Sequence, residues 1–546
     1  MEGIVNWRGN PVDPRKHGGV RATLFLYTLV VVRSSINAAN TNLVGFFRST
    51  HNMTIDRSVI LSTNFGGATW MLSILGAFVT DSYMKRFNAI LLFGPFEILG
   101  FGLLALQVHI PSLHLPPCNL NQNLQADCES LHGWRTSLLY LGLFMVAIGE
   151  GFMRAATPGF GGDQFNSDDP SESKLKIRFF DFAAMATCFG AFLGLVLVVW
   201  IQIFKGWDLG LGMCALFIVA GLLIAAVGFP IYCNKKPSGS PLTSIVQVFV
   251  VALKNRKVHV SPENLEDPQI NADATDDITS LEVLPRTKDL RFLDKASIYT
   301  GDTNAWSYCS ISQVEEAKIF VKMLPILISS IFCYLPFSFF FTLTAPAAST
   351  MNTKLMGVKI APASLYAFAV VLQFIVLVMN NRIIIPAMQK YTSSRYYYTT
   401  SHLVCAGIGF VFAMLGTGVA ALVERKRRLA EDPKDLSFLW SLPQFICVGL
   451  MEVLSFVGLM EFFSNQLPVQ LKALSSSMVF FIVGMSIWLD GALVAIVGRV
   501  TRLGDMESGW LDGMEFDSTR LDLFYALLTA LQLLSFFSFV FCARRY

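Results

Sequence analysis

The sequence predicts an all-α integral membrane protein of about twelve transmembrane helices, arranged as two halves of six helices each. Three observations predict it. Hydrophobic residues make up 53% of the chain and charged residues only 15%, whereas ordinary soluble domains contain about 25% charged residues. The apolar residues form long blocks instead of alternating positions. The polar segment 235–315 divides these blocks into two groups of six.

The apolar blocks are long enough to cross a hydrocarbon core of about 30 Å, which requires about 20 residues in a helix. Seven blocks contain no charged residue: 58–80, 182–204, 209–234, 323–353, 360–381, 396–423 and 523–543. Five more contain one or two ionisable residues: 22–47, 87–108, 136–158, 436–463 and 473–498. Together they give the predicted count of twelve.

The distribution of basic residues predicts that the N-terminus is cytosolic. Arg8, Arg15, Lys16 and Arg21 precede the first span, and no short apolar segment with a small-residue cleavage site precedes them, so we expect no cleaved signal peptide. Most basic loops then face the cytosol, as the positive-inside tendency requires. The cluster 425–428 would face outside, so either it is a tolerated exception or the span count of the second half is off by one.

The spacing of the blocks predicts four regions. These are a cytosolic N-terminal segment 1–21, an N-terminal six-helix half 22–234, a cytosolic linker 235–315 without a long apolar run, and a C-terminal six-helix half 316–543. Two such halves around a central cavity are typical of the major facilitator architecture, in which the halves rock around a substrate held near the midplane.

Several function classes are disfavoured by the sequence. The net charge of +3 and the scattered basic residues argue against a nucleic-acid partner. No histidine lies deep in a span, so a converging nucleophile, base and orienting group is not expected, and we predict no enzyme. The phosphate-binding pattern G-x-x-x-x-G-K-[ST] does not occur in the chain, which excludes an ATP-driven motor of that type.

The expected partners are the lipid bilayer and a small-molecule substrate. We expect no metal and no other cofactor, because the cysteines show no paired zinc-like spacing. Cys118 and Cys128 share a loop on the predicted outer side, where a disulfide could persist, and the sequence leaves that bridge open. The oligomeric state is also left open.

Ionisable residues inside the spans are the candidates for function, because a charge in the bilayer core is costly. Arg33 lies in the first span and Glu452 about midway along the tenth. Glu150 and Arg154 lie in the fourth span at i,i+4 spacing, which places them on one helix face where they can pair. A pair that only supports packing remains the alternative. The other acids in the spans are Glu97, Glu461 and Asp490. We interpret the first two as partners in helix contacts and leave the third undecided.

Short motifs distributed over essentially the whole chain carry a family resemblance. They are Lys16-His17-Gly18-Gly19, Gly76-Ala77-Phe78 with Asp81, Gly162-Asp163-Gln164-Phe165, Phe292-Leu293-Asp294-Lys295-Ala296, Val314-Glu315-Glu316-Ala317-Lys318, Glu452-Val453 and Leu459-Met460-Glu461-Phe462-Phe463. Together they resemble the plant nitrate and peptide transporter family within the proton-dependent oligopeptide transporters. The resemblance implies a major facilitator fold.

The resemblance also implies proton coupling through a Glu-x-x-Glu-Arg/Lys motif in the first helix, and here the sequence departs from the family. When Asn42-Leu43-Val44 is aligned with the family's segment after this motif, Leu29 and Val32 occupy the two glutamate positions. Arg33 occupies the basic position. Since both acids are missing, we expect transport to depend only weakly on the proton gradient.

The resemblance implies further site residues. Arg154 corresponds to the family's fourth-helix lysine, and Glu452 to the tenth-helix glutamate that faces the substrate amine in peptide carriers. Glu150 is an additional acid. Phe337 takes the place of a seventh-helix histidine used by a nitrate carrier, which disfavours nitrate. We therefore predict substrate binding by Arg33, Arg154, Phe337 and Glu452, and coupling or gating by Glu150 and Glu452.

The leading hypothesis is a secondary transporter that moves a small organic anion, such as a plant hormone acid, by alternating access. Two arginines without the family acids would make the N-terminal side of the cavity positive, and guanidinium groups pair well with carboxylates. The stretch 234–243 also resembles branches that include carriers of abscisic acid and gibberellin. The alternatives are a non-transporting membrane sensor or interaction protein on the same fold, and a proton-coupled nitrate or peptide carrier. The plasma membrane is expected before the vacuolar membrane.

Overall fold

A computed structural model describes most of the chain. The described residues are 4–6, 8–13, 16–113, 115, 131–166, 169–237, 239, 241–256, 286–287, 289–298, 306–355, 357–379, 395–468, 471–472, 474–502 and 509–546. The side chains of 395–401 are not included. The predicted bridge between Cys118 and Cys128 falls outside the described residues.

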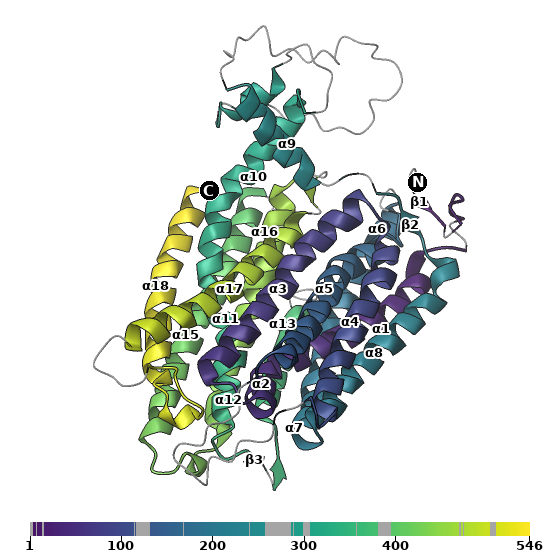
Figure 1. Cartoon of the computed structure of the whole chain (residues 1–546). Coiled ribbons are helices and arrows are strands. Elements are labelled where there is room, and N and C mark those ends of the chain that lie inside the picture. Colours follow the sequence, from purple (N-terminus) through teal and green to yellow (C-terminus); the bar gives the residue numbers. More distant parts are fainter. Residues whose placement is uncertain are drawn as a thin grey trace, which may run out of the picture.

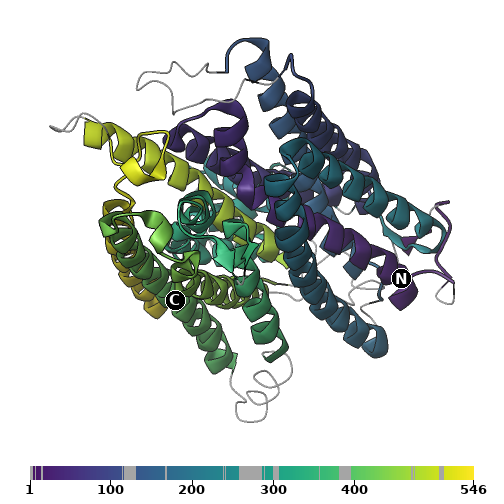
Figure 2. The same cartoon turned by 90° about the horizontal axis from the view of Figure 1, so that it is seen from below.

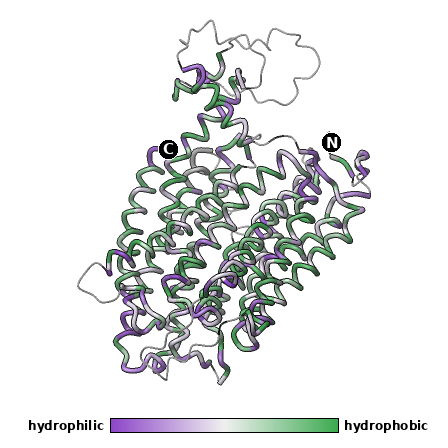
Figure 3. Tube along the Cα trace, viewed as in Figure 1, coloured by the Kyte–Doolittle hydropathy of each residue, from purple (hydrophilic) through white to green (hydrophobic). Residues whose placement is uncertain are grey.

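The described residues form an all-α structure with twelve helical segments that are long and apolar enough to cross a membrane, which confirms the predicted fold class. The six segments of the N-terminal group lie beside the six of the C-terminal group (Figures 1 and 2). Both chain ends and the linker helix lie at the same end of the molecule (Figure 1). Hydrophobic residues run along the helices and hydrophilic residues gather near their ends (Figure 3), as a lipid-embedded bundle requires.

The N-terminal group contains helices α1 to α8. Their bounds are α1 Gly19–Ala39, α2 Leu43–His51, α3 Ile55–Ser82, α4 Arg86–His109, α5 Trp134–Gly162, α6 Pro170–Leu193, α7 Val199–Phe204 and α8 Trp207–Val227. The first span runs through α1 and α2, and the fifth through α6 and α7. A π-helical turn, Gly194–Val198, joins α6 to α7.

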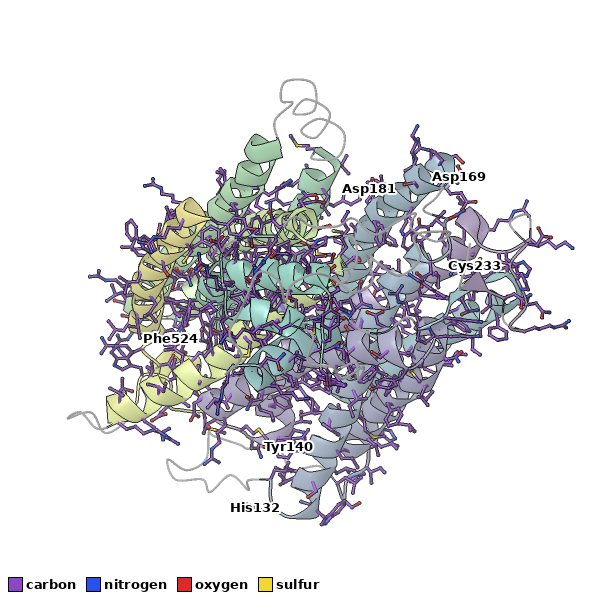
Figure 4. All side chains as sticks on the ribbon, turned by 90° about the horizontal axis from the view of Figure 1, so that it is seen from above. His132, Tyr140, Asp169, Asp181, Cys233 and Phe524 are labelled. Atoms are coloured by element: carbon purple, nitrogen blue, oxygen red, sulfur yellow. The ribbon has the colours of Figure 1, made fainter. Side chains whose placement is uncertain are left out.

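The C-terminal group contains helices α10 to α18. Their bounds are α10 Ile311–Cys333, α11 Pro336–Phe339, α12 Ala345–Ala348, α13 Tyr366–Met379, α15 Arg395–Leu429, α16 Leu442–Gln466, α17 Leu474–Arg502 and α18 Leu521–Arg545. A short hairpin of β3 Lys354–Leu355 and β4 Val358–Lys359 precedes the eighth span. From the end that carries both termini, Cys233 and Asp169 of the first group lie far from Phe524 of the second (Figure 4).

The seventh span is longer and more broken than the predicted block 323–353. It runs over Ile311–Ala348, because the Ser310 hydroxyl and the Gln313 side chain cap the start of α10 reciprocally. The first turns of α10 contain charged residues, so they were not part of the predicted apolar block. The break before α11 coincides with Pro336, which has no backbone N–H to donate.

The described part of the linker contains no span-length apolar run, in keeping with the sequence, but it does contain one short apolar helix. Strand β2, Asn234–Lys235, pairs antiparallel with β1, Ile4–Val5, near the N-terminus. Helix α9, Pro241–Lys254, is apolar but only 14 residues long, which is too short to cross the bilayer core. It packs against the helical turn Leu293–Ser297 and the start of α10.

The basic cluster 425–428 lies at the end of α15, opposite the end that carries the termini, and the span count of the second half is correct. The Arg427 side chain is 2% exposed, and its Nε lies 2.8 Å from Glu424 Oε2. It also pairs with Asp517. The Lys426 Nζ lies 3.4 Å from the centre of the Trp440 ring. These partners compensate the charges of Lys426 and Arg427 at this end of the bundle.

Glycines allow α4 and α5 to approach closely. A Cβ atom added to Gly100 would lie 2.7 Å from Val146 N and 2.8 Å from Gly142 O, both backbone atoms of α5. Small residues at helix contacts are a general means of bringing backbones together in membranes. This contact positions the α5 residues described below relative to α4.

We expect Gly100→Ala to destabilise the protein by about 1–3 kcal/mol, because the added methyl group meets backbone that cannot move aside without separating α4 from α5. Gly102→Ala in the same helix is the matched control, since its added Cβ would have no atom within 4 Å. Thermal unfolding of the two purified variants in detergent measures the difference. Equal unfolding temperatures would contradict the close packing of these helices.

The two groups of helices meet along α3 and α17. An added Cβ on Gly67 of α3 would lie 2.2 Å from Cδ1 of Trp488 in α17, and the Trp488 Nε1 donates to the Asn64 carbonyl at 3.3 Å. Towards the end opposite the termini, Arg502 Nη2 lies 3.3 Å from Asp56 Oδ2. These contacts hold the two groups together on that side of the molecule.

Candidate functional site

Three charged side chains of the N-terminal group meet at one carboxylate. Arg33 of α1 donates from Nη1 to Glu150 Oε1 at 3.0 Å, and Arg154 of α5 donates from Nη2 to the same oxygen at 2.7 Å. Arg154 Nη2 also donates to Asn37 Oδ1 of α1 at 3.1 Å. The predicted pair of Glu150 and Arg154 is therefore part of a triad, which we call the arginine triad (Arg33, Glu150 and Arg154).

The arginine triad is largely withdrawn from solvent. The exposed fractions of the side chains are 13% for Arg33, 5% for Arg154 and 2% for Glu150. The i,i+4 spacing on α5 places Glu150 and Arg154 on one face. The Trp70 ring of α3 lies 3.8 Å from the Arg154 guanidinium carbon and supports it through a cation–π contact. The charged groups of the triad are therefore stabilised mainly by contacts with the protein and not by water.

A fourth ionisable residue, Glu97 of α4, lies beside the arginine triad. Glu97 is 1% exposed. It lies directly against Gly149 of α5, because a Cβ atom added to Gly149 would be 2.5 Å from the Glu97 Cβ. Its carboxyl group interacts electrostatically with all three members of the triad. Among the described residues, neither Glu97 oxygen has a hydrogen-bond partner. The helix contact expected for Glu97 is present in the backbone packing, but its carboxyl group is not paired.

The two positions at which the family motif has glutamates lie against another helix. Leu29 is fully buried, and an added Cβ on Gly221 of α8 would lie 3.4 Å from Leu29 Cδ1 and 3.3 Å from Val32 Cγ1. Leu29 and Val32 therefore pack towards α8, while Arg33 of the same helix points to Glu150 of α5.

Glu452 is held by two donors of α13. The Tyr366 hydroxyl and the Gln373 amide both donate to Glu452 Oε2, the latter at 2.5 Å. Glu452 lies on α16, so these hydrogen bonds join the eighth span to the tenth. Helix α13, which supplies both donors, also contacts α6 of the N-terminal group. The predicted Glu452 site therefore lies next to the contact between the two groups of helices.

Phe337 connects to Glu452 through aromatic rings. Its ring centroid lies 5.3 Å from that of Phe341. The Phe341 ring in turn lies 4.6 Å from the Tyr366 ring, which carries the hydroxyl that donates to Glu452. Phe337 is half-buried and also packs edge-on against Tyr334 at 6.4 Å. The contacts seen for Phe337 are thus aromatic packing contacts.

The predicted site residues form two groups. Arg33, Glu150 and Arg154 are together, and Phe337 is connected to Glu452, but among the described residues no hydrogen bond joins Glu452 to the arginine triad. Trp70 connects the triad to the C-terminal group of helices, because its ring also lies 5.5 Å from the Phe480 ring of α17.

The search for ionisable residues missed four neutral side chains that hold the charged ones in place: Asn37, Trp70, Tyr366 and Gln373. A search for polar amides inside apolar blocks would have found Gln373, which lies in the charge-free block 360–381. Asp490, which the sequence left undecided, accepts a hydrogen bond from Ser338 and joins α17 to α11. Glu461 is exposed.

The chain matches the family model described as "POT family" over residues 87–511. It is 32% identical to Protein NRT1/ PTR FAMILY 4.3 of Arabidopsis thaliana over 100% of this chain and 92% of that protein. It is 34% identical to Protein NRT1/ PTR FAMILY 4.4 of the same plant, over 99% and 90%.

The fold is similar to that of solved structures of POT family transporters. The in meso crystal structure of the POT family transporter PepTSo has a TM-score of 0.68 at 16% identity and covers 98% of this chain and 99% of its own. An auto-inhibited POT family peptide transporter has a TM-score of 0.66 at 14% identity, with 96% and 97% covered. These likenesses concern the fold, whereas the family match and the plant relatives carry the assignment: the chain belongs to the POT family and is a multi-pass membrane transporter, not an enzyme.

Proposed function

We propose that this protein carries a small organic anion with an apolar body, such as a plant hormone acid, across the membrane by alternating access. The observation that supports it is the charge of the arginine triad. Two guanidinium groups share one oxygen of a single carboxylate, so the triad alone has one positive charge in excess. A carboxylate of a substrate is the type of group that this excess attracts.

The donors of the triad leave room for an additional acceptor. Arg33 Nε has no hydrogen-bond partner among the described residues. The Arg33 side chain is also the most exposed of the three. A guanidinium presents its donors in a planar fork that matches a carboxylate, so we propose Arg33 and Arg154 as the groups that bind the anion.

The aromatic and acidic residues of the C-terminal group would complete the site. Phe337 and Phe341 offer apolar surface for the body of the substrate, and Glu452 would bind a polar group of it. We propose that residues 22–234 and 316–543 move as two bodies around this site, joined by the cytosolic linker 235–315, and that Glu150 and Glu452 take part in gating. We also propose the plasma membrane as the location.

Uptake by purified protein in proteoliposomes tests this function. The radiolabelled panel contains abscisic acid, gibberellic acid, nitrate and a dipeptide. We expect uptake of a hormone acid above that of empty liposomes, and competition by the unlabelled acid but not by its methyl ester, which has the same apolar body without the charge. Preferred uptake of nitrate or the dipeptide would contradict the proposal. Binding of the acid without uptake would indicate a sensor on the transporter fold instead.

A further inference from the structure

Glu97 is a buried acid beside the arginine triad, and within the described part of the chain its carboxyl group has no hydrogen-bond partner. Its backbone is pressed against Gly149, the residue before Glu150, so the carboxyl group cannot be far from the triad. Both of its oxygens are buried and lack a hydrogen-bond partner among the described residues. An ionised carboxylate without hydrogen bonds is costly to bury, which favours the neutral, protonated form.

We propose that Glu97 binds the proton that this transporter moves together with its anionic substrate. This deepens the proposed function by naming its energy source, and it rests on that function. The two first-helix glutamates of the family motif are absent from this chain. Leu29 and Val32 occupy their positions and pack against α8. Glu97 on α4 would reach the same arginines from a different helix.

Counting charges shows why proton and anion would bind together. With Glu97 protonated, Arg33, Arg154 and Glu150 have a net charge of one positive, which a monovalent anion neutralises. With Glu97 ionised, the four groups are already neutral and the anion would make them negative. Each ligand therefore favours the other, and by linkage the effect is reciprocal.

The transported proton moves without any covalent change in the substrate. On the loading side a proton from water forms an O–H bond at the Glu97 carboxyl group as the anion binds to the guanidinium groups. On the opposite side the anion leaves, the excess positive charge of the arginines favours the Glu97 carboxylate, and the proton returns to water. One anion and one proton cross per cycle, so the cycle is electroneutral.

The groups that face Glu97 come from three other helices. Helix α5 contributes Glu150 and Arg154, α1 contributes Arg33, and α8 contributes the buried thiol of Cys214. The charged residues at the contacts of α4 with α3 and β2 lie near Arg86, about three helical turns from Glu97. The arginine triad is thus the main electrostatic environment of Glu97.

This proposal differs from the weak proton dependence expected from the sequence. That expectation considered the first-helix positions, Glu150 and Glu452 as proton carriers. Glu150 is held by two arginines and Glu452 by two neutral donors, whereas none of the described residues donates a hydrogen bond to Glu97.

A first test requires no substrate. Infrared difference spectra of the reconstituted protein at neutral pH, wild type minus Glu97→Gln, should contain the carbonyl band of one protonated carboxylic acid. The control is Glu461→Gln, which removes an exposed acid of another span and should leave that band in place. A Glu97→Gln spectrum that retains the full band would overturn the proposal, whatever the protein transports.

A second test uses uptake of abscisic acid into proteoliposomes with and without an imposed inside-alkaline pH gradient. We expect accumulation by the wild type to rise by about tenfold per pH unit at one proton per anion. Glu97→Gln should lose this response but keep exchange of internal for external abscisic acid, which needs no net proton movement. A gradient response that persists in Glu97→Gln would overturn the proposal. Absence of abscisic acid uptake in both proteins would count against the proposed substrate, while the infrared result still decides the role of Glu97.

Discussion

Arg154→Ala is expected to reduce uptake to the background of empty liposomes and to destabilise the protein by about 3 kcal/mol, the lower part of the range for breaking a buried ion pair. The change removes two hydrogen bonds to Glu150, one to Asn37 and the cation–π contact with Trp70. Glu150 keeps its contact with Arg33, which is why we do not expect complete unfolding. Uptake normalised to reconstituted protein and thermal unfolding measure the two effects.

A double variant separates substrate binding from packing. In Arg154→Ala with Glu150→Gln, the carboxylate that lost a partner is also neutralised, so most of the lost stability should return. We expect uptake to stay at background, because an anion would still lack the Arg154 guanidinium. Arg154→Lys is the matched variant that keeps the charge without the planar fork. Full recovery of uptake in the double variant would show that Arg154 serves only as a partner for Glu150.

Glu452→Ala is expected to destabilise the protein by about 1–3 kcal/mol, because it leaves the Tyr366 hydroxyl buried without its acceptor. The Gln373 amide loses its bond to Glu452 and keeps only the longer one to the Tyr366 hydroxyl, at 3.4 Å. Glu452→Gln keeps an oxygen at this position and should cost much less. Thermal unfolding of the two variants measures this difference, and equal stability would mean that the hydrogen bonds to Glu452 contribute little.

The transport behaviour of Glu452→Gln distinguishes substrate binding from proton coupling. We expect this variant to raise the KM for the substrate anion by about tenfold, the effect of losing one interaction of about 1.4 kcal/mol, while the response to a pH gradient persists. Tyr366→Phe removes one donor but keeps the ring against Phe341, and should affect KM in the same direction but less. Loss of the gradient response in Glu452→Gln would place the coupling acid on α16 and not at Glu97.

Much of the fold was predictable because the thickness of the bilayer sets the minimum length of each apolar stretch that spans it. Each of the twelve spans contains an apolar stretch of the length that a helix needs to cross the core. Where this constraint does not apply, the sequence was less informative: the first turns of α10 carry charges, and α9 is apolar but too short to cross the membrane. Neither case is determined by the thickness of the bilayer.

The candidate site was predictable only where local geometry decides it. Glu150 and Arg154 are four residues apart on one helix, and their pairing follows from the helical repeat. Tyr366 and Gln373 were not predicted as partners of Glu452, because 86 and 79 residues separate them along the chain. Such contacts depend on how neighbouring helices are rotated about their axes, which a pattern within one helix does not contain.

The sequence by itself determined that the chain is a membrane protein with twelve spans, which residues place charge inside the bilayer, and that Glu150 can pair with Arg154. Only the tertiary structure decided that Arg33, 117 residues away from Glu150, bonds to the same oxygen as Arg154. It also decided that Glu97 lies beside them with no hydrogen-bond partner in the described part of the chain. The physical reason is that these relations are set by helix contacts at small residues such as Gly149. Close packing there decides which charges meet and which one is left unpaired.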